Sequence, residues 1–238
     1  MPQPLLPRPQ NKVSVALEPA DARIWRGRGI VIDLFRFSNT ICALLESGRG
    51  DVRVYSEPAR ALAALSREKN SDLFSEIDFG PGVDSYDNSP YTALYASDPS
   101  RPALSVTNSG SPAAASLLLA KEILIGCFAN FTALVSYCRA NPMPTLIVPA
   151  CLFYNRAHVE DFICARALEL DLAGGDSFAE ALGEIHSSGR VLDFMAFRPE
   201  TGKRDLELVL KKSWIKAVPR VTFKAGVGLV ENVAGRSK

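Results

Sequence analysis

Several predicted strands are followed directly by polar side chains whose types suit phosphate or metal chemistry. The first of these junctions is GIVIDLFRFSNTICALL, in which Asp33 and Arg36 follow a short apolar run. A carboxylate can hold a divalent cation, and a guanidinium can make two parallel hydrogen bonds to a phosphate or a sulfonate. In the alternative interpretation Asp33 only caps a turn and Arg36 is solvated, and position alone favours neither.

A second junction, SVTNSGSPAAAS, places Asn108 and Ser109 between a predicted strand and a predicted helix. Small residues let an anion approach the backbone N–H groups of a helix N-terminus. Ser111 and Pro112 are equally what an ordinary capped helix needs, and capping is the favoured interpretation of this segment on its own. Asn130, in IGCFANFTAL, is likewise either a polar group at a strand end or an N-cap residue.

Charged residues gather at the start of another predicted helix, in VPACLFYNRAHVEDFICARALEL, which contains Arg156, Glu160 and Asp161. Acidic residues in a first turn commonly interact with the helix dipole. Adjacent carboxylates also point to different sides of a helix, so we expect one at most to face a given site. Asn88 lies in VDSYDNSPY, whose Asn-Ser-Pro sequence by itself predicts a turn.

Short apolar runs alternate with helical patterns along the chain. The predicted strands are 13–17, 29–33, 51–55, 103–107, 123–128 and 145–149. The predicted helices are 38–47, 57–69, one from Ser111, 130–140, 158–173 and 177–187. This alternation favours an α/β fold with a largely parallel or mixed sheet flanked by helices. In such folds ligands bind beyond the carboxyl ends of the strands, where the polar junctions lie.

Two regions depart from the alternation. Residues 71–101 are rich in Asp, Ser, Pro and Gly and predict a long irregular stretch, a kind of segment that is usually functional or disordered. Residues 214–230 predict short strands, with Gly226 and Gly228 in turns. We expect residues 1–12 to form a flexible tail and residues 13–238 to form one α/β unit. The alternative organisation is two α/β lobes with the site between them.

The composition excludes several classes of function. The 238 residues include 27 Lys and Arg against 26 Asp and Glu, so the net charge of +1 provides no overall field for nucleic acid or an anionic membrane. No segment reaches the ~20 apolar residues of a membrane-spanning helix. The five cysteines form no C-x-x-C pair, and two histidines are too few for a zinc site or a triad. Reduced thiols, a cytoplasmic location and a homodimer are the expectations.

Taken in order, these segments resemble the signatures of the 2-phosphosulfolactate phosphatase (ComB) family. VIDLFRFSNT resembles a V-x-D-x-x-R-x-S-x-T signature, DNSP a GNSP element, VTNSG a TTNGT-like strand end and CFANFTA an SFxNxxA segment. VPAC, followed by Arg156, Glu160 and Asp161, is similar to a PAG turn followed by an Arg and a helix-starting ED. GKRDL and AVPRV resemble an SGREL-like and a VVPxx-like segment of the family pattern. The resemblance therefore extends over roughly residues 25–222 in one register.

The resemblance implies a ComB-like α/β fold and a Mg²⁺-dependent phosphatase. Its implied substrate is a small anionic phosphoester, 2-phospho-3-sulfolactate, which is cleaved to sulfolactate and phosphate on the route to coenzyme M. A metal ion held by Asp33, with Glu160 or Asp161, would neutralise the transferring phosphoryl group and lower the pKa of a bound water. The attacking group stays open between water and an aspartate carboxylate.

The resemblance also implies which side chains would bind the substrate. Arg36 and Arg156 would bind phosphate and sulfonate oxygens, because both groups suit the guanidinium fork. Asn88, Asn108 and Asn130 would fix the substrate through neutral hydrogen bonds.

Three glycine positions of the family pattern are changed in this chain, to Asp87, Ser109 and Cys151, and Ser85 stands at an aspartate position. Glycine at such places allows a positive φ or a close approach of the backbone to an anion. We therefore expect a reshaped pocket. The alternative function, from a different class, is a non-catalytic relative that binds an anionic metabolite, because Asp87 would repel a phosphate.

Overall fold

The structure is a computed structural model that describes residues 12–234. Residues 1–11 of the predicted tail lie outside the described residues. Lys12, which ends that predicted tail, already accepts a backbone hydrogen bond from Thr145 (2.9 Å).

Within the described residues the strands form one nine-stranded sheet, in the order β1–β7–β2–β6–β8–β9–β3–β5–β4. The strands are β1 (Val13–Val15), β2 (Arg28–Ile32), β3 (Val52–Tyr55), β4 (Asp72–Phe74), β5 (Ala103–Ser105), β6 (Glu122–Gly126), β7 (Thr145–Pro149), β8 (Pro219–Lys224) and β9 (Val227–Asn232).

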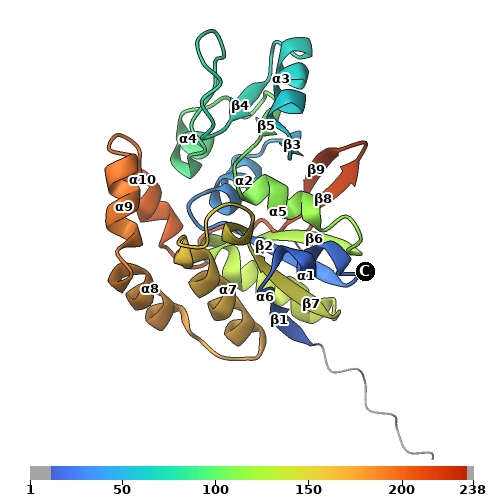
Figure 1. Ribbon diagram of the computed structural model, residues 1–238, viewed down its shortest axis with the longest axis vertical. Coiled ribbons are helices and arrows are strands. Elements are labelled where there is room, and N and C mark those ends of the chain that lie inside the picture. Colours follow the sequence, from blue (N-terminus) through green and yellow to red (C-terminus); the bar gives the residue numbers. More distant parts are fainter. Residues whose placement is uncertain (1–11, 235–238) are drawn as a thin grey trace, which may run out of the picture.

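The sheet contains two parallel groups joined by an antiparallel hairpin. Strands β1, β7, β2 and β6 are parallel to one another, as are β3, β5 and β4. The hairpin β8–β9 pairs antiparallel with β6 on one side and with β3 on the other. Figure 1 shows the β3–β5–β4 group above the β2–β6–β7 group, with the hairpin at one side. The predicted α/β fold with a mixed, mostly parallel sheet is confirmed.

Ten α-helices lie within the described residues, with two short 3₁₀ segments, Phe128–Asn130 and Ala150–Phe153. The helices are α1 (Pro19–Ile24), α2 (Phe37–Glu46), α3 (Pro58–Arg67), α4 (Pro90–Tyr95), α5 (Gly110–Ser116), α6 (Phe131–Ala140), α7 (Val159–Leu172), α8 (Phe178–Ser187), α9 (Arg190–Phe197) and α10 (Gly202–Val209).

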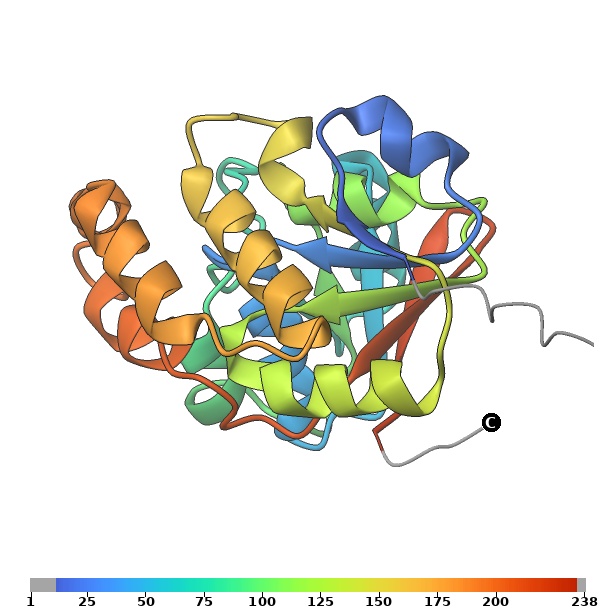
Figure 2. The same ribbon diagram turned by 90° about the horizontal axis from the view of Figure 1, so that it is seen from below.

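Helices cover both faces of the larger parallel group, which explains why its strands read as continuous apolar runs. Ile30 and Ile32 of β2 belong to one core cluster, with side chains of α6, α7 and α8. Val31, between them, belongs to the opposite cluster, with side chains of α1, α2 and α5. Figure 2 shows the strands running between α6 on one side and α1 on the other.

The structure corrects the sequence prediction in two places. Residues 71–101 contain β4 and α4, so the stretch predicted as irregular carries two short elements. Strand β4 has only three residues and is fixed by pairing with β5, and α4 begins at Pro90 behind a Ser89 cap, so neither leaves a periodic pattern. Gly228 lies inside β9 and not in a turn; the hairpin turns at Ala225 and Gly226, which both have positive φ.

Other sequence expectations concern the chain as a whole. All five cysteines are free and buried, as predicted. Across residues 12–234 no helix has the length and apolar character to cross a membrane. Whether the two parallel groups behave as separate lobes stays a prediction.

The N-termini of α2 and α5 approach each other closely where the site forms. A Cβ on Gly110, the first residue of α5, would lie 2.3 Å from Cδ1 and 2.6 Å from Cβ of Phe37, the first residue of α2. Phe37 is fully buried. Only glycine therefore fits at position 110 without moving one helix start away from the other.

We expect Gly110→Ala to destabilise the folded chain by about 1–3 kcal/mol, as overpacking of a filled core does. Gly183→Ala is the matched control, because Gly183 is exposed in α8 with no atom within 4 Å of an added Cβ. That variant is expected to gain up to about 1 kcal/mol through helix propensity. Urea unfolding of both measures the difference, and equal stability of the two variants would contradict the packing argument.

Candidate active site

A pocket of about 620 Å³ opens where loops from both parallel groups meet α9. Its lining is polar with an aromatic side: Phe35, Arg36, Glu76, Asn88, Asn108, Ser109, Tyr154, Asn155, Ala157, His158, Arg190, Asp193, Phe194, Phe197 and Arg198. Another cavity, of about 680 Å³, lies against α3 and β9, and none of the predicted site residues lines it. The first pocket is therefore the candidate active site.

The loops after β2 and β5 are held by the same kind of hydrogen bond, from a backbone N–H of the loop to a serine hydroxyl of the next helix. The Oγ of Ser38 accepts a hydrogen bond from the Asp33 N–H (2.9 Å), and the Oγ of Ser111 accepts one from the Thr107 N–H (2.9 Å). In each case a serine in the first turn of the helix holds a residue of the loop before it. Ser111, which the sequence analysis favoured as a cap, lies inside α5, and its own N–H donates to the Thr107 hydroxyl (2.9 Å).

Asp33 lies behind the pocket and contacts both helix starts. Its Oδ1 accepts from the Phe37 N–H (3.2 Å) and its Oδ2 from the Ser109 hydroxyl (2.7 Å). Burial, with the negative charges of Glu76 and Glu160, raises the pKa of Asp33 to about 7, against the opposing effect of its hydrogen bonds. The neighbouring negative charges add to the effect of burial on this pKa, and a bound cation would offset them.

A second carboxylate, Glu76, is fixed on the turn that also carries Ser109. Its Oε1 accepts from the Asn108 N–H (2.7 Å) and its Oε2 from Nδ2 of Asn88 (3.0 Å). Burial raises the pKa of Glu76. The Oδ1 of Asn88 is itself buried and has no hydrogen-bond partner among the described residues. Asp33, Glu76 and the Asn88 carbonyl thus offer oxygen donors at one end of the pocket.

The two adjacent acidic residues of α7 point in different directions, as predicted. Asp161 accepts from the backbone N–H groups of Leu34 (2.7 Å) and Cys151 (2.9 Å), so it ties the ends of β2 and β7 together. Glu160 makes a bidentate pair with Arg190 (2.7 and 3.0 Å). Burial, and then the charges of Asp33 and Glu160, raises the pKa of Asp161 well above its usual value.

These contacts bear on the predicted metal set of Asp33, Glu160 and Asp161. Within residues 12–234 no three His, Cys, Asp or Glu side chains gather closely enough to form a ligand cluster. Both oxygens of Asp161 and both of Glu160 already accept hydrogen bonds from this chain. Asp33 lies close enough to Glu160 and Asp161 for their charges to interact, and its own two oxygens also accept hydrogen bonds, so the predicted metal set stays a prediction.

Arg36 is buried between two carboxylates. Its Nη2 donates to both oxygens of Asp87 (2.8 and 2.7 Å), and its Nη1 donates to Asp205 of α10. The guanidinium also lies over the ring of Phe194, 5.2 Å from its centroid. Arg36 is thus neither solvated nor available without a change in these pairs.

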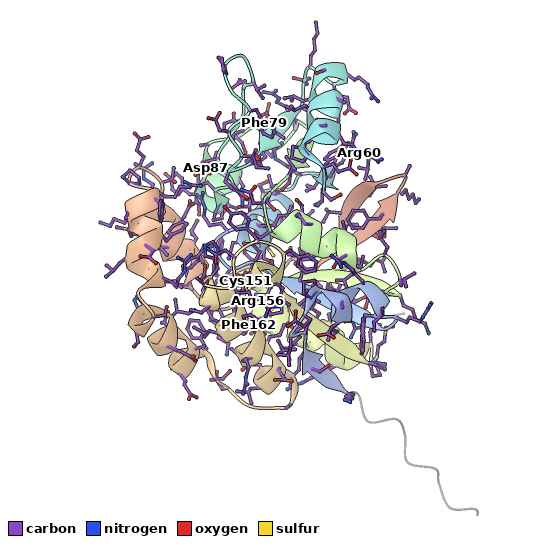
Figure 3. The ribbon with its side chains drawn as sticks, in the orientation of Figure 1. Arg60, Phe79, Asp87, Cys151, Arg156 and Phe162 are labelled. Carbon is purple, nitrogen blue, oxygen red and sulfur yellow. The ribbon has the colours of Figure 1, made fainter. Side chains whose placement is uncertain are left out.

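Two other predicted substrate contacts lie away from the pocket. Arg156 is half exposed and pairs with Glu18 (2.6 Å); Figure 3 shows Arg156 and Cys151 on the segment between β7 and α7, apart from Asp87. Asn130 is fully buried, and its side chain holds the backbone at Cys127, Ile125 and Ala217 (3.1–3.2 Å). Asn130 thus stands at the N-cap position of α6 without a side-chain cap hydrogen bond, and its side chain bridges neighbouring backbone segments.

The sequence analysis missed five charged residues of the site: Glu76, Arg190, Asp193, Arg198 and Asp205. Glu76 lies in the stretch predicted as irregular, and the three residues Arg190, Asp193 and Arg198 lie on or just after α9, which was not predicted. Asp205 belongs to the GKRDL segment, which was noted in the resemblance without a role. That segment was the only signal in the sequence for any of the five.

The three changed glycine positions do not have the strained backbone expected of glycine. Among described residues other than glycine, only Ser213 and Ala225 have positive φ. Asp87 and Ser109 instead use their side chains on Arg36 and Asp33. Cys151 is buried, and its N–H donates to Asp161. Asp87 and Ser109 therefore make side-chain contacts in a backbone geometry that does not require glycine, whereas the Cys151 contact is made by its backbone; a reshaped pocket stays a prediction.

Comparison with known proteins agrees with the motifs. Residues 17–222 match the sequence model of a family described as 2-phosphosulpholactate phosphatase. A probable 2-phosphosulfolactate phosphatase of Thermoplasma volcanium is 26% identical over 196 residues, which are 82% of this chain and 89% of that protein. Both findings bear out the resemblance and the predicted enzyme class, a phosphoric monoester hydrolase.

The raised pKa of Asp33 predicts a pH-dependent stability in metal-free protein. Because the folded-state pKa lies above that of an unfolded aspartate, the folded chain binds the proton more tightly and loses stability as the pH rises from about 4 through 7. Asp33→Asn removes this loss, so its stability relative to wild type should be roughly 1–3 kcal/mol greater at about pH 8 than at about pH 5.

Urea unfolding in EDTA measures this difference, and the exposed Asp84→Asn serves as the control for loss of one carboxylate. A stability difference between Asp33→Asn and wild type that does not change with pH would contradict the assignment of the raised pKa to Asp33.

Proposed function

Because the chain belongs to the 2-phosphosulpholactate phosphatase family, we propose that it hydrolyses the phosphate ester of 2-phospho-3-sulfolactate or of a related small phosphoester. Water is consumed, and the alcohol and inorganic phosphate are released. The observation that carries this proposal is the pocket itself, which is lined by the carboxylate of Glu76 and the guanidiniums of Arg190 and Arg198, with Asp33 and the paired Arg36 beside them. With sulfolactate as product, the reaction would belong to a route to coenzyme M.

Mg²⁺ is the proposed cofactor, and the oxygen donors at and beside the pocket suit it. Mg²⁺ is usually held by one or two carboxylates together with substrate phosphate oxygens and water. Asp33 and Glu76 supply the carboxylates, and the unpartnered Oδ1 of Asn88 supplies a further oxygen. When bound there, the ion would act as a Lewis acid on the phosphoryl oxygens.

The protein's own groups bind and orient the anion. Arg198 has the weakest ion pair of the three pocket arginines. Its Nε lies 3.6 Å from Asp87, and its Nη1 donates to the carbonyl of Phe197. Arg190 faces the same space from α9 but is shared with Glu160. Asn88 and Asn108 line the opposite wall, where a neutral hydrogen bond fixes position without adding charge.

Phosphate release with Mg²⁺ and after EDTA tests the proposal directly. We expect turnover that EDTA removes and Mg²⁺ restores, and we expect Asp33→Ala to reduce kcat/KM by at least about 100-fold while the chain stays folded. Circular dichroism verifies the fold. No phosphate release from any small ester by folded protein would favour the non-catalytic relative; release by Asp33→Ala at most of the wild-type rate would remove Asp33 from the site.

The arrangement of the arginines gives an independent prediction. Arg198→Ala should raise KM about tenfold or more, because it removes a charged hydrogen-bond donor from the anion. Arg156→Ala is the matched control, since Arg156 pairs with Glu18 outside the pocket and its loss should change KM less than about threefold. A larger effect at Arg156 than at Arg198 would restore the binding role predicted from the sequence.

Location and assembly are further proposals that the pocket does not bear on. The balanced charge favours a protein that does not bind nucleic acid, the cysteine content favours the cytoplasm, and a homodimer is expected because symmetric dimers are the commonest oligomers.

A further inference from the structure

The side chain of Ser109 connects the buried carboxylate of Asp33 with the pocket. Asp33 is only 4% exposed and does not line the pocket, whereas Ser109 does. The Ser109 hydroxyl donates to Oδ2 of Asp33 (2.7 Å), and the Phe37 N–H donates to Oδ1 (3.2 Å). Of these two donors only Ser109 belongs to the pocket lining, so Asp33 acts on the pocket through this hydroxyl.

The hydroxyl of Ser109 is not used to hold its own helix. Ser109 is the N-cap residue of α5, a position at which a serine oxygen ordinarily accepts from a backbone N–H of the first turn, but its side chain makes no such bond. Its hydrogen goes to Asp33 instead, and within residues 12–234 no group donates to its oxygen. The lone pairs of that oxygen therefore stay available to a ligand.

Two further oxygen groups line the pocket beside Ser109. Oδ1 of Asn88 has no partner among the described residues, although the residue is only 3% exposed. Glu76 accepts from Nδ2 of the same amide (3.0 Å) and from the N–H of Asn108, the residue before Ser109 (2.7 Å). Glu76 thus fixes both the Asn88 amide and the turn that carries Ser109. A buried amide oxygen without a partner is costly, and a ligand at this place would satisfy it.

The orientation of the Ser109 hydroxyl suits a cation and not an anion. A phosphate oxygen would need the hydroxyl hydrogen, which Asp33 already accepts, whereas a cation needs the lone pairs, which point elsewhere. Mg²⁺ takes oxygen ligands and is usually held by a small number of carboxylates with other oxygens. Serine and threonine hydroxyls bind Mg²⁺ in nucleotide-binding P-loops. The hydroxyl, amide and carboxylate at this wall of the pocket are therefore a donor set for Mg²⁺.

We propose that the Ser109 hydroxyl is itself a ligand of the divalent cation, joining the oxygen donors named above, and that Asp33 holds it in the ligating orientation by accepting its hydrogen. This inference rests on the proposed function, since it concerns the cofactor proposed for the same pocket. Ser109 occupies a position where the family pattern has glycine, so the chain supplies here a ligand that glycine cannot supply.

Binding of divalent cations to the substrate-free protein tests the inference without any turnover. Electron paramagnetic resonance follows Mn²⁺, and competition with Mn²⁺ measures Mg²⁺. We expect Ser109→Ala to weaken both affinities by about tenfold or more. Ser116→Ala is the matched control, because it removes a hydroxyl from the same helix that donates to the Ala113 carbonyl (2.6 Å) and does not line the pocket. That variant should stay within about twofold of wild type.

Ser109→Cys distinguishes a ligand from a residue that only orients Asp33. A thiolate prefers a soft cation such as Cd²⁺ to Mg²⁺ or Mn²⁺. We expect this variant to gain Cd²⁺ affinity relative to Mn²⁺ by about tenfold or more, and to show the ultraviolet absorption of a thiolate bound to Cd²⁺. Ser116→Cys adds a thiol to the same helix away from the pocket and should show neither change. Thermal unfolding shows which variants are folded.

Unchanged Mn²⁺ affinity in folded Ser109→Ala overturns the inference. Folded Ser109→Cys that neither gains Cd²⁺ affinity nor shows the absorption also overturns it, and leaves Ser109 as a residue that only orients Asp33. Absence of Mn²⁺ and Mg²⁺ binding to wild type would reject both the inference and the proposed cofactor. The phosphatase proposal is judged separately: the expected binding changes in a wild-type protein that releases phosphate from no ester would support the role of Ser109 and count against hydrolysis.

Discussion

One buried ion pair organises this site: the guanidinium of Arg36 against the carboxylate of Asp205. Both side chains are almost completely excluded from water, and removing one partner of such a pair typically costs 3–5 kcal/mol because it leaves a buried charge. Asp205 also accepts from the Ser89 hydroxyl (2.7 Å) and the Tyr91 N–H (3.2 Å) at the start of α4. The pair therefore connects the loop after β2 with α4 and α10.

The pocket depends on a second set of contacts, made by carboxylates to backbone N–H groups. Asp161 joins the strand ends of β2 and β7, and Glu76 fixes the turn after β5. Asp33 reaches the starts of both α2 and α5. These carboxylates are buried and repel one another, so negative charge is concentrated around the pocket. Arginines from α9 and from the loop after β2 lie close enough to offset that charge.

This balance explains how substitutions at glycine positions are accommodated. Asp87 adds a negative charge but meets Arg36 and Arg198, and Ser109 adds a hydroxyl that donates to Asp33. The core fixes the strand ends, and side chains in the loops that follow them set the charge of the pocket lining.

The α/β class, the residues at the strand ends and the buried thiols followed from the sequence, because apolar periodicity is local and reports burial directly. Asp33 and Asn108 were placed at strand ends for the same reason, whereas Asn88 was assigned to the site only by the family resemblance, because its own sequence predicts a turn. The sequence did not predict which residues the charged side chains pair with. Arg36 and Asp205 are 169 positions apart, and nothing local distinguishes an arginine that binds a ligand from one that is paired within the chain. Glu76 and Arg198 were missed because they lie beside short elements that are stabilised by packing and pairing and have no periodic pattern of their own. The tertiary structure alone determines which charged side chains pair, because it brings segments that are distant in the sequence together in a poorly hydrated space.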